Sequence, residues 1–250
     1  MRRVDAFSTP VFVTRDESEA AERVAGEIAR LLRAKPDVVL GLASGHTPLA
    51  LYRRLVELHG AGLDFSAART FNLDVYEGLN GEEPWSFRAF MRTVLFEPAE
   101  FSLEKTHFPA RRSESEPPAE AARRFEEEIR NAGGIDLQIL GIGRNGHIGF
   151  NEPGSEPSSR TRRVELCEET RRVNRADFPP GVEVPTHAMT MGIATILGAK
   201  KLRVLAFGES KAGIIRRALL EPMSPKLPAT YLRGHPAVEL WLDEAAARLL

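Results

Sequence analysis

One short stretch of the chain concentrates side chains that can carry protons. It reads GRNGHIGFNE over residues 143–152 and follows an apolar run. Glycines on both sides of His147 let the backbone turn back, so the imidazole can meet the carboxylate of Glu152. A carboxylate beside a histidine orients the ring and stabilises its charged form, so the pair can act as an acid/base group. Asn145 lies close enough in the sequence to support this pair.

A second candidate is Asp74, which follows the apolar run Thr70–Leu73 in the segment FNLDVYEGL. A carboxylate at the end of a strand can act as a base toward a bound carbon acid. The same position also suits a helix cap or a loop hydrogen bond. The residues alone therefore leave the role of Asp74 open.

A third segment, GLASGHTP at residues 41–48, offers a site for an anion. Gly45 permits a tight turn, the following helix begins with free N–H groups, and Ser44 and Thr47 add hydroxyls. The lysine of a P-loop is missing from this segment. The alternative is an ordinary strand-to-helix turn, with Thr47 as the helix cap and Pro48 at the first helical position.

The elements that must position these segments alternate along the whole chain. Compact apolar runs predict strands near 12–13, 37–43, 70–73, 136–143, 186–191, 201–207 and 238–242. Helical spacing predicts helices at 16–34, 47–59, 84–96, about 121–131, 192–198, 209–220 and 243–249. We therefore expect a single doubly wound α/β domain over residues 1–250, with a mostly parallel sheet, helices on both faces and a small helical lid near 160–180. In such folds ligands bind beyond the carboxyl ends of the strands, where the three segments fall.

Composition excludes several other classes of protein. The formal net charge is −1 over 250 residues, which argues against broad binding to nucleic acid. No apolar run approaches the roughly 20 residues that span a bilayer. The single cysteine, Cys167, cannot form an internal disulfide, and its charged surroundings indicate a structural role. We expect a cytoplasmic protein. No metal site is expected, because His107, His187 and His235 stand alone.

Taken together, the segments SGHTP, FNLDVYEGL and GIGRNGHIGFNEPG resemble the isomerising glucosamine-6-phosphate deaminases, a family related to the 6-phosphogluconolactonases. The likeness covers nearly the whole chain. It implies a hydrolase that converts glucosamine 6-phosphate and water to fructose 6-phosphate and ammonium, without metal or nicotinamide cofactor. It further implies N-acetylglucosamine catabolism, an amino-sugar phosphate as the only partner besides copies of the chain in a homo-oligomer, and no role for nucleic acid or membrane.

The resemblance also assigns roles to residues at matching positions. His147 opens the sugar ring, with Glu152 and Asn145 in support, and Asp74 moves a proton between C2 and C1. The phosphate is held by residues of the SGHTP segment and by a lysine near the start of a later helix, namely Ser44, Gly45, His46, Thr47 and Lys211.

Some positions depart from the family pattern. Asn145 stands where many members have aspartate, and His46 replaces a usual second glycine. Arg175 is a near match, one place early, to an arginine of the family's lid. Residues 160–175 contain six arginines against three glutamates, a local net charge of +3, which predicts attraction of a small dianion to the lid.

Three alternatives remain beside the main hypothesis. One is a 6-phosphogluconolactonase-like hydrolase, although Asp74-Val75-Tyr76 and Phe150–Pro153 favour the deaminase pattern. Another is a deaminase for a different amino-sugar phosphate, such as galactosamine 6-phosphate. The third is a catalytically silent sugar-phosphate sensor. The chain stops shortly after its last predicted strand, so we expect little or no activation by N-acetylglucosamine 6-phosphate.

Overall fold

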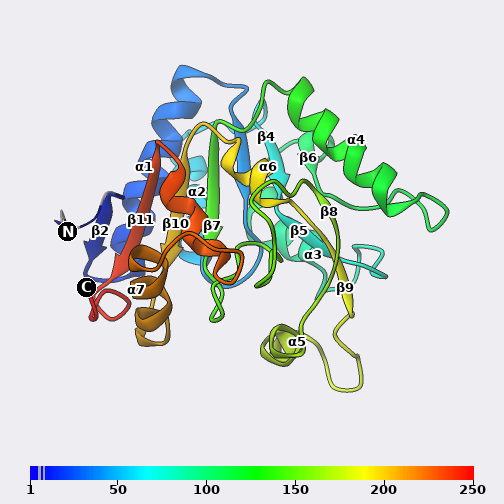
Figure 1. Cartoon of the computed structure of the whole chain (residues 1–250). Coiled ribbons are helices and arrows are strands. Elements are labelled where there is room, and N and C mark those ends of the chain that lie inside the picture. The colour runs from blue at the N-terminus through cyan, green and yellow to red at the C-terminus, as the bar shows by residue number, and fades with distance from the viewer. Residues whose placement is uncertain (5–6, 8) are drawn as a thin grey trace.

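An eight-stranded sheet with helices on both faces forms the centre of the computed structural model, which describes residues 1–4, 7 and 9–250 (Figure 1). The strand order is β1-β2-β11-β10-β7-β3-β4-β6, and the pairs are parallel except for β1 with β2. The strands are β1 (Arg2–Val4), β2 (Val11–Thr14), β3 (Val39–Leu42), β4 (Arg69–Asn72), β6 (Thr106–His107), β7 (Leu137–Gly141), β10 (Leu202–Ala206) and β11 (Val238–Asp243).

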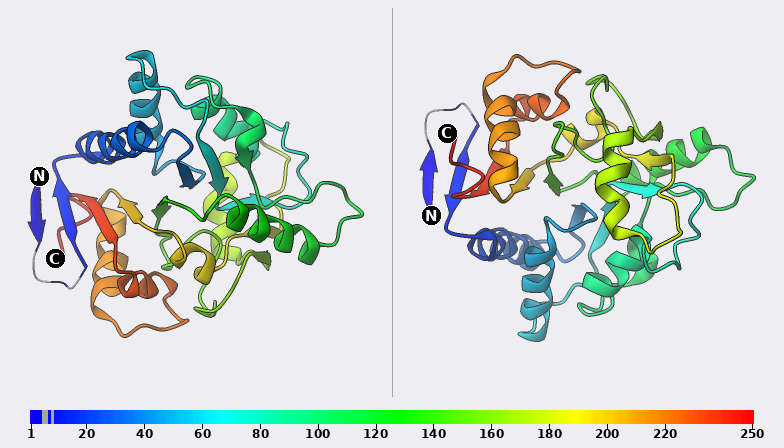
Figure 2. Two further views of the ribbon diagram at one scale, coloured as in Figure 1. Left: turned by 90° about the horizontal axis from the view of Figure 1, so that it is seen from above. Right: turned by 90° about the horizontal axis from the view of Figure 1, so that it is seen from below.

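Two groups of helices bury the two faces of this sheet. One face packs against α1 (Glu17–Ala34), α2 (Leu49–Gly60) and a π-helical turn at Arg92–Phe96 that continues α3 (Phe87–Met91). The other packs against α4 (Pro118–Asn131), α6 (Ile193–Leu197), α7 (Ala212–Leu220) and a 3₁₀ helix at Pro228–Gly234. Figure 2 shows α1 and α2 on one side of the sheet and α7 on the other. No helix among the described residues is long and apolar enough to cross a membrane.

The strands are apolar on both faces because both faces are covered. In β10, Val204 belongs to the cluster under α7, whereas its neighbour Leu205 belongs to the cluster under α1. Helix α1 shows the matching pattern, since Val24, Ile28 and Leu32 form one buried stripe. The compact apolar runs of the sequence, apart from the one near 186–191, are therefore correctly predicted as buried parallel strands.

The strand order places the carboxyl ends of β10, β7, β3 and β4 side by side. After β3 the chain continues to β4 on one side, and β7 later pairs with β3 on the other side. This change of direction creates the crevice in which α/β folds bind ligands.

A second, three-stranded antiparallel sheet stands beyond the end of β4. It consists of β5 (Asp74–Tyr76), β9 (His187–Thr190) and β8 (Arg162–Glu165), in the order β5-β9-β8. The strand predicted near 186–191 is therefore present, but it lies in this sheet and not in the parallel one. Asp74 pairs with Thr190, so β9 fixes the backbone that carries the Asp74 carboxylate.

Three predicted helices differ from the structure. Helix α2 begins at Leu49 with Pro48 at the cap position and no side-chain cap, so the predicted capping by Thr47 is wrong. The helix predicted at 84–96 begins only at Phe87, because Ser86 caps it by accepting a hydrogen bond from the Ala89 N–H. The helix predicted at 243–249 is a series of turns, since the Asp243 carboxylate accepts a hydrogen bond from the Ala246 N–H.

The region predicted as a helical lid is only partly helical. Its first part is strand β8, followed by α5 (Glu168–Asn174) and a 3₁₀ turn at Arg175–Asp177. The short strands β1 and β6 at the two edges of the large sheet were not predicted. Both are too short for their residue pattern to identify.

Gly41 of β3 provides a test of how tightly the two strands beneath the crevice pack. A Cβ at this position would lie 2.0 Å from Oε1 of Gln138, its fully buried partner on β7. We expect Gly41→Ala to lower the free energy of unfolding by roughly 1–3 kcal/mol, because overpacking a filled interior forces strain. Urea denaturation measures this loss.

The matched control is Gly60→Ala at the end of α2, where nothing lies within 4 Å of the added Cβ. The double variant Gly41→Ala/Gln138→Ala should recover part of the stability that Gly41→Ala loses. Strictly additive losses in the double variant would contradict a clash between the two side chains.

Candidate active site

A cavity of about 350 Å³ opens where the carboxyl ends of β3, β4, β7 and β10 meet. All three segments singled out in the sequence contribute to its lining, together with Lys211. Helix α5 closes the open side, and Figure 1 shows this helix set apart from the main sheet, beyond the strand ends. Parallel strands therefore bring together residues that lie far apart in the sequence.

One end of the cavity is built to receive an anion. Gly45 adopts a φ of 113°, a conformation that favours glycine, and places Ser44 and Thr47 at the cavity wall. Ser44 Oγ accepts a hydrogen bond of 3.5 Å from the Asn72 side chain. His46 is exposed, and its Nε2 lies 3.7 Å from Oδ1 of Asp177 on the lid.

Lys211 adds a positive charge at this end. It ends a 3₁₀ turn at Glu209–Lys211, directly before α7, and its Nζ donates a 2.7 Å hydrogen bond to the carbonyl of Ile142. Burial lowers the pKa of Lys211, and the nearby Arg144 guanidinium lowers it further. A cationic end with free hydroxyls suits a phosphate.

A tight turn after β7 presents the imidazole of His147. The Gly143 N–H donates to the His147 carbonyl at 2.9 Å, and the Gly146 N–H donates to the Gly143 carbonyl at 3.0 Å. The ring lies directly against Gly143, since a Cβ there would be 2.3 Å from ring atoms Cε1 and Nε2. Any other residue at position 143 would displace the ring.

Glu152 lies behind the imidazole and holds it. Its Oε2 is 3.4 Å from His147 Nδ1 and accepts a 2.7 Å hydrogen bond from Asn145 Nδ2. Its Oε1 accepts hydrogen bonds from the Thr170 hydroxyl and, at 3.3 Å, from the Cys167 thiol. Burial raises the pKa of Glu152, but the contacts with His147, Thr170 and Asn145 outweigh burial and hold the pKa at about 2. Glu152 is therefore ionised at neutral pH.

Asp74 has the opposite surroundings. Its side chain is buried, and none of the described residues donates a hydrogen bond to its carboxylate. Burial raises the pKa of Asp74 to about 7. Oδ2 would lie 3.6 Å from a Cβ on Gly149, so the carboxylate is next to the segment that carries His147. A carboxyl group with this pKa can take up and release a proton near neutral pH.

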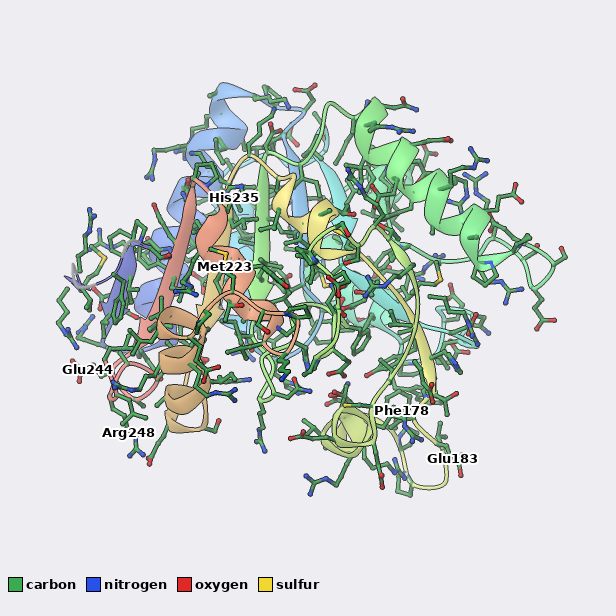
Figure 3. The ribbon with its side chains drawn as sticks, viewed as in Figure 1. Phe178, Glu183, Met223, His235, Glu244 and Arg248 are labelled. Atoms are coloured by element: carbon green, nitrogen blue, oxygen red, sulfur yellow. The ribbon has the colours of Figure 1, made fainter. Side chains whose placement is uncertain are left out.

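The lid is docked onto the cavity by polar and aromatic contacts. Asn174 of α5 donates a 2.8 Å hydrogen bond to the Tyr76 hydroxyl on β5. The Phe178 ring meets the Tyr76 ring edge-on at 5.2 Å, and Figure 3 shows Phe178 beside α5. Cys167 caps the start of α5 by accepting a hydrogen bond from the Thr170 N–H. The thiol that was predicted to be merely structural thus also contacts Glu152.

The structure does not place Arg175 at the anion site. Its Nη1 donates to the carbonyls of Phe178 and Pro179, at 3.0 and 3.1 Å, and both carbonyls follow directly after the turn at Arg175–Asp177. Arg175 is not among the described residues that line the cavity, and neither is any other arginine of 160–175. The attraction predicted for this basic stretch therefore does not act from the cavity wall.

Several residues of the site were missed by sequence reasoning. Thr170 and Asn174 carry no signal in the sequence, since only the docking of α5 brings them to the cavity. Arg144 could have been found, because it is a basic residue inside the segment that carries His147. Within the described part of the chain no group of three or more His, Cys, Asp or Glu could hold a metal ion. Figure 3 shows His235 at the other end of the strands, away from the lid residue Phe178.

Over residues 15–241 the chain matches the family model described as glucosamine-6-phosphate isomerases/6-phosphogluconolactonase. Two curated relatives carry the name glucosamine-6-phosphate deaminase. The protein from Rhodopirellula baltica is 50% identical over 236 residues, which cover 94% of this chain and 93% of that protein. The protein from Shewanella loihica is 46% identical over 241 residues, which cover 96% of this chain and 89% of that protein.

Two solved structures are also similar to this chain. A structure described as a monomeric glucosamine-6-phosphate deaminase is 39% identical with a TM-score of 0.92, covering 96% of this chain and 99% of that one. The 6-phosphogluconolactonase from Trypanosoma brucei is 21% identical with a TM-score of 0.75, covering 98% of this chain and 100% of that one. The likeness to the lactonase is a likeness of fold.

The raised pKa of Asp74 predicts a cost in stability. A carboxyl whose pKa rises on folding favours the folded state only at low pH, and this contribution is lost as the pH rises through the folded pKa of about 7. We expect Asp74→Asn to stabilise the protein by roughly 1–3 kcal/mol at pH 8 and by less at pH 5. Urea denaturation at the two pH values measures the difference.

Asp64→Asn serves as the control. The Asp64 carboxylate is hydrogen-bonded by the Ser66 N–H, which lowers its pKa, so this variant should gain no stability as the pH rises. A gain from Asp74→Asn that is the same at both pH values would contradict the raised pKa.

Proposed function

The chain belongs to the family of glucosamine-6-phosphate isomerases and 6-phosphogluconolactonases, and we propose that it is an isomerising deaminase. It converts glucosamine 6-phosphate and water to fructose 6-phosphate and ammonium. The curated relatives at 46% and 50% identity bear the name of this enzyme. Those names speak of a deaminase and not of a hydrolase, so the wider label hydrolase is not carried over to this chain.

The observation that carries this proposal is the pair of carboxyl groups with opposite pKa values in one cavity. Glu152 is held ionised at a pKa of about 2, whereas burial raises the pKa of Asp74 to about 7. Such a division of pKa values assigns one group to electrostatic support and the other to proton transfer. An isomerisation that moves hydrogen between neighbouring carbons requires both.

His147 acts first, on the closed sugar ring. Ring opening moves a proton from O1 to O5, which needs a group that both accepts and donates a proton near neutral pH. Glu152, whose Oε2 lies 3.4 Å from Nδ1, orients the imidazole. Asn145 supports the same arrangement, since its Nδ2 donates to Glu152 while its Oδ1 accepts from the His147 N–H.

Asp74 then acts on the open chain. Its carboxylate takes the proton from C2. The electron pair of that C–H bond forms the C1–C2 double bond, and the π pair of the C1 carbonyl moves to O1, which takes up a proton, so that an enolamine results. Returning the proton from Asp74 to C1, while the nitrogen lone pair forms the C=N bond, leaves a protonated imine at C2. Water adds to this imine, and the C2–N bond breaks to release ammonia, which is protonated to ammonium. Ser44, Gly45, His46, Thr47 and Lys211 hold the phosphate and so orient the reacting end.

The alternatives are less well supported. The lactonase at 21% identity shares the fold, whereas the deaminases share 39–50% of their residues with this chain. The residues that separate glucosamine from galactosamine 6-phosphate belong to no motif, so glucosamine rests on the relatives' names. We further propose a cytoplasmic role in N-acetylglucosamine catabolism, consistent with a single free cysteine. A homo-oligomer stays a prediction.

Release of ammonium from glucosamine 6-phosphate, read out with glutamate dehydrogenase, tests the proposed function directly. We expect wild-type protein to release ammonium and Asp74→Asn to lose roughly 10²–10⁴-fold in kcat while still binding the product, because the base is gone but the phosphate site is intact. Absence of ammonium from wild-type protein that binds the sugar phosphate would favour the silent sensor. Release from galactosamine 6-phosphate alone would assign the other epimer.

The role of His147 predicts a selective defect. His147→Gln keeps a polar side chain but carries no transferable proton, so it should slow turnover of the cyclic substrate roughly 10²–10⁴-fold and an acyclic analogue much less. His187→Gln, on β9 outside the cavity lining, is the control and should behave like wild type. Equal losses on the cyclic and acyclic substrates would remove ring opening from the role of His147.

A further inference from the structure

We propose that Arg144, paired with Lys211, binds the phosphate of the substrate from the strand side of the cavity, in place of an arginine on the lid. This inference rests on the proposed function, because it names a residue that recognises the same sugar phosphate. It concerns a side chain to which neither the motifs nor the relatives' names assign a role.

The position of Arg144 brings a second cation to the anion end of the cavity. The side chain lines the cavity together with Lys211 and Ser44. Lys211 Nζ is bonded at 2.7 Å to the carbonyl of Ile142, two residues before Arg144, so the turn and the lysine are fixed to one another. Arg144 is close enough for its charge to destabilise the charged form of Lys211. An anion placed between two neighbouring cations of this kind offsets the repulsion between them.

Arg144 also has no counter-ion in the part of the chain that the structure describes. None of the described residues forms an ion pair or hydrogen bond with its guanidinium. By contrast, Arg203 is paired with Glu27 at 2.7 Å, and Arg163 is paired with Glu77 at 2.7 Å. An unpaired guanidinium at a cavity wall is free to form the two-pronged hydrogen bonds that arginine makes with phosphate oxygens.

The lid presents the wrong charges for this task. Its cavity-lining residues are neutral or acidic, namely Glu169, Thr170, Val173, Asn174 and Asp177. No arginine of the described lid residues lines the cavity; Arg162 bonds to Asn151 and Ser155, and Arg175 bonds to backbone carbonyls. A phosphate dianion would be repelled by two lid carboxylates and attracted by two cations opposite them. The anion therefore lies on the strand side.

This placement couples phosphate binding to the acid/base group. Arg144 and His147 belong to one tight turn, which is closed by the hydrogen bond between the Gly143 N–H and the His147 carbonyl. A phosphate held by Arg144 restrains the same turn that presents the imidazole. Binding energy from the remote phosphate can then serve to orient the reacting groups.

The test compares Arg144→Ala and Arg144→Lys with wild-type protein. We expect Arg144→Ala to weaken binding of inorganic phosphate, measured by calorimetry, and to raise KM for glucosamine 6-phosphate, each by roughly 10- to 100-fold, as for lost hydrogen bonds to a charged group. Arg144→Lys should recover only part of the affinity, because lysine keeps the positive charge but lacks the planar guanidinium that forms two parallel hydrogen bonds to a phosphate. Turnover of glucosamine without the phosphate should be the same in Arg144→Ala and wild type.

Two lid variants provide matched controls. Arg172→Ala and Arg175→Ala remove exposed arginines outside the cavity lining, so phosphate affinity should stay within about twofold of wild type. Arg144 is exposed, and unchanged near-ultraviolet circular dichroism would show that its variants are folded.

The inference is overturned if Arg144→Ala binds phosphate as wild type does, or if Arg175→Ala is the variant that loses affinity. It is also overturned if Arg144→Ala slows glucosamine and glucosamine 6-phosphate equally. Phosphate binding is measured without turnover. Wild-type protein that binds phosphate through Arg144 but releases no ammonium would therefore refute the proposed function and leave the role of Arg144 standing.

Discussion

The half-buried carboxylate of Glu152 is the group on which the arrangement of the site depends. Removing an ionised carboxylate from water costs several kcal/mol, which hydrogen bonds and nearby positive charge offset. The contacts come from two directions: Asn145 donates from the turn after β7, where His147 Nδ1 lies 3.4 Å away, whereas Cys167 and Thr170 donate from the start of α5. The same carboxylate therefore contacts both the imidazole and the start of the lid helix, and it links the position of one to that of the other.

The surroundings of the two carboxyl groups explain how similar side chains can do different work in one cavity. Glu152 is surrounded by donors and remains charged, whereas Asp74 is buried without donors among the described residues, and burial raises its pKa to about 7, so that it is about half protonated at pH 7. A donor added beside Asp74 would strengthen the fold but lower the pKa of this carboxyl. The surroundings of Asp74 among the described residues therefore combine a local loss of stability with the raised pKa that the proposed base needs.

Much of the fold and the centre of the site could be predicted from the sequence. Buried parallel strands leave continuous apolar runs, and glycines beside His147 and Gly45 reveal turns at their ends. What could not be predicted depends on contacts between distant segments. The pairing of β5 with β9 has no local signal, so Asp74 could be identified but not its backbone support. The charge of residues 160–175 was visible, but only packing decides that Arg175 turns to backbone carbonyls and away from the cavity.

The pairing of Asp74 with Thr190 has a consequence for the order in which the chain matures during synthesis. The glycine loop and β4 leave the ribosome early, yet the strand that fixes Asp74 belongs to the last third of the chain, as does Lys211. Because contacts between distant segments form late, a nascent chain has a partly formed sheet well before it has a working cavity. A truncated product that ends before β9 would carry Asp74 and Glu152 but lack both the strand that pairs with Asp74 and the cavity-lining Lys211.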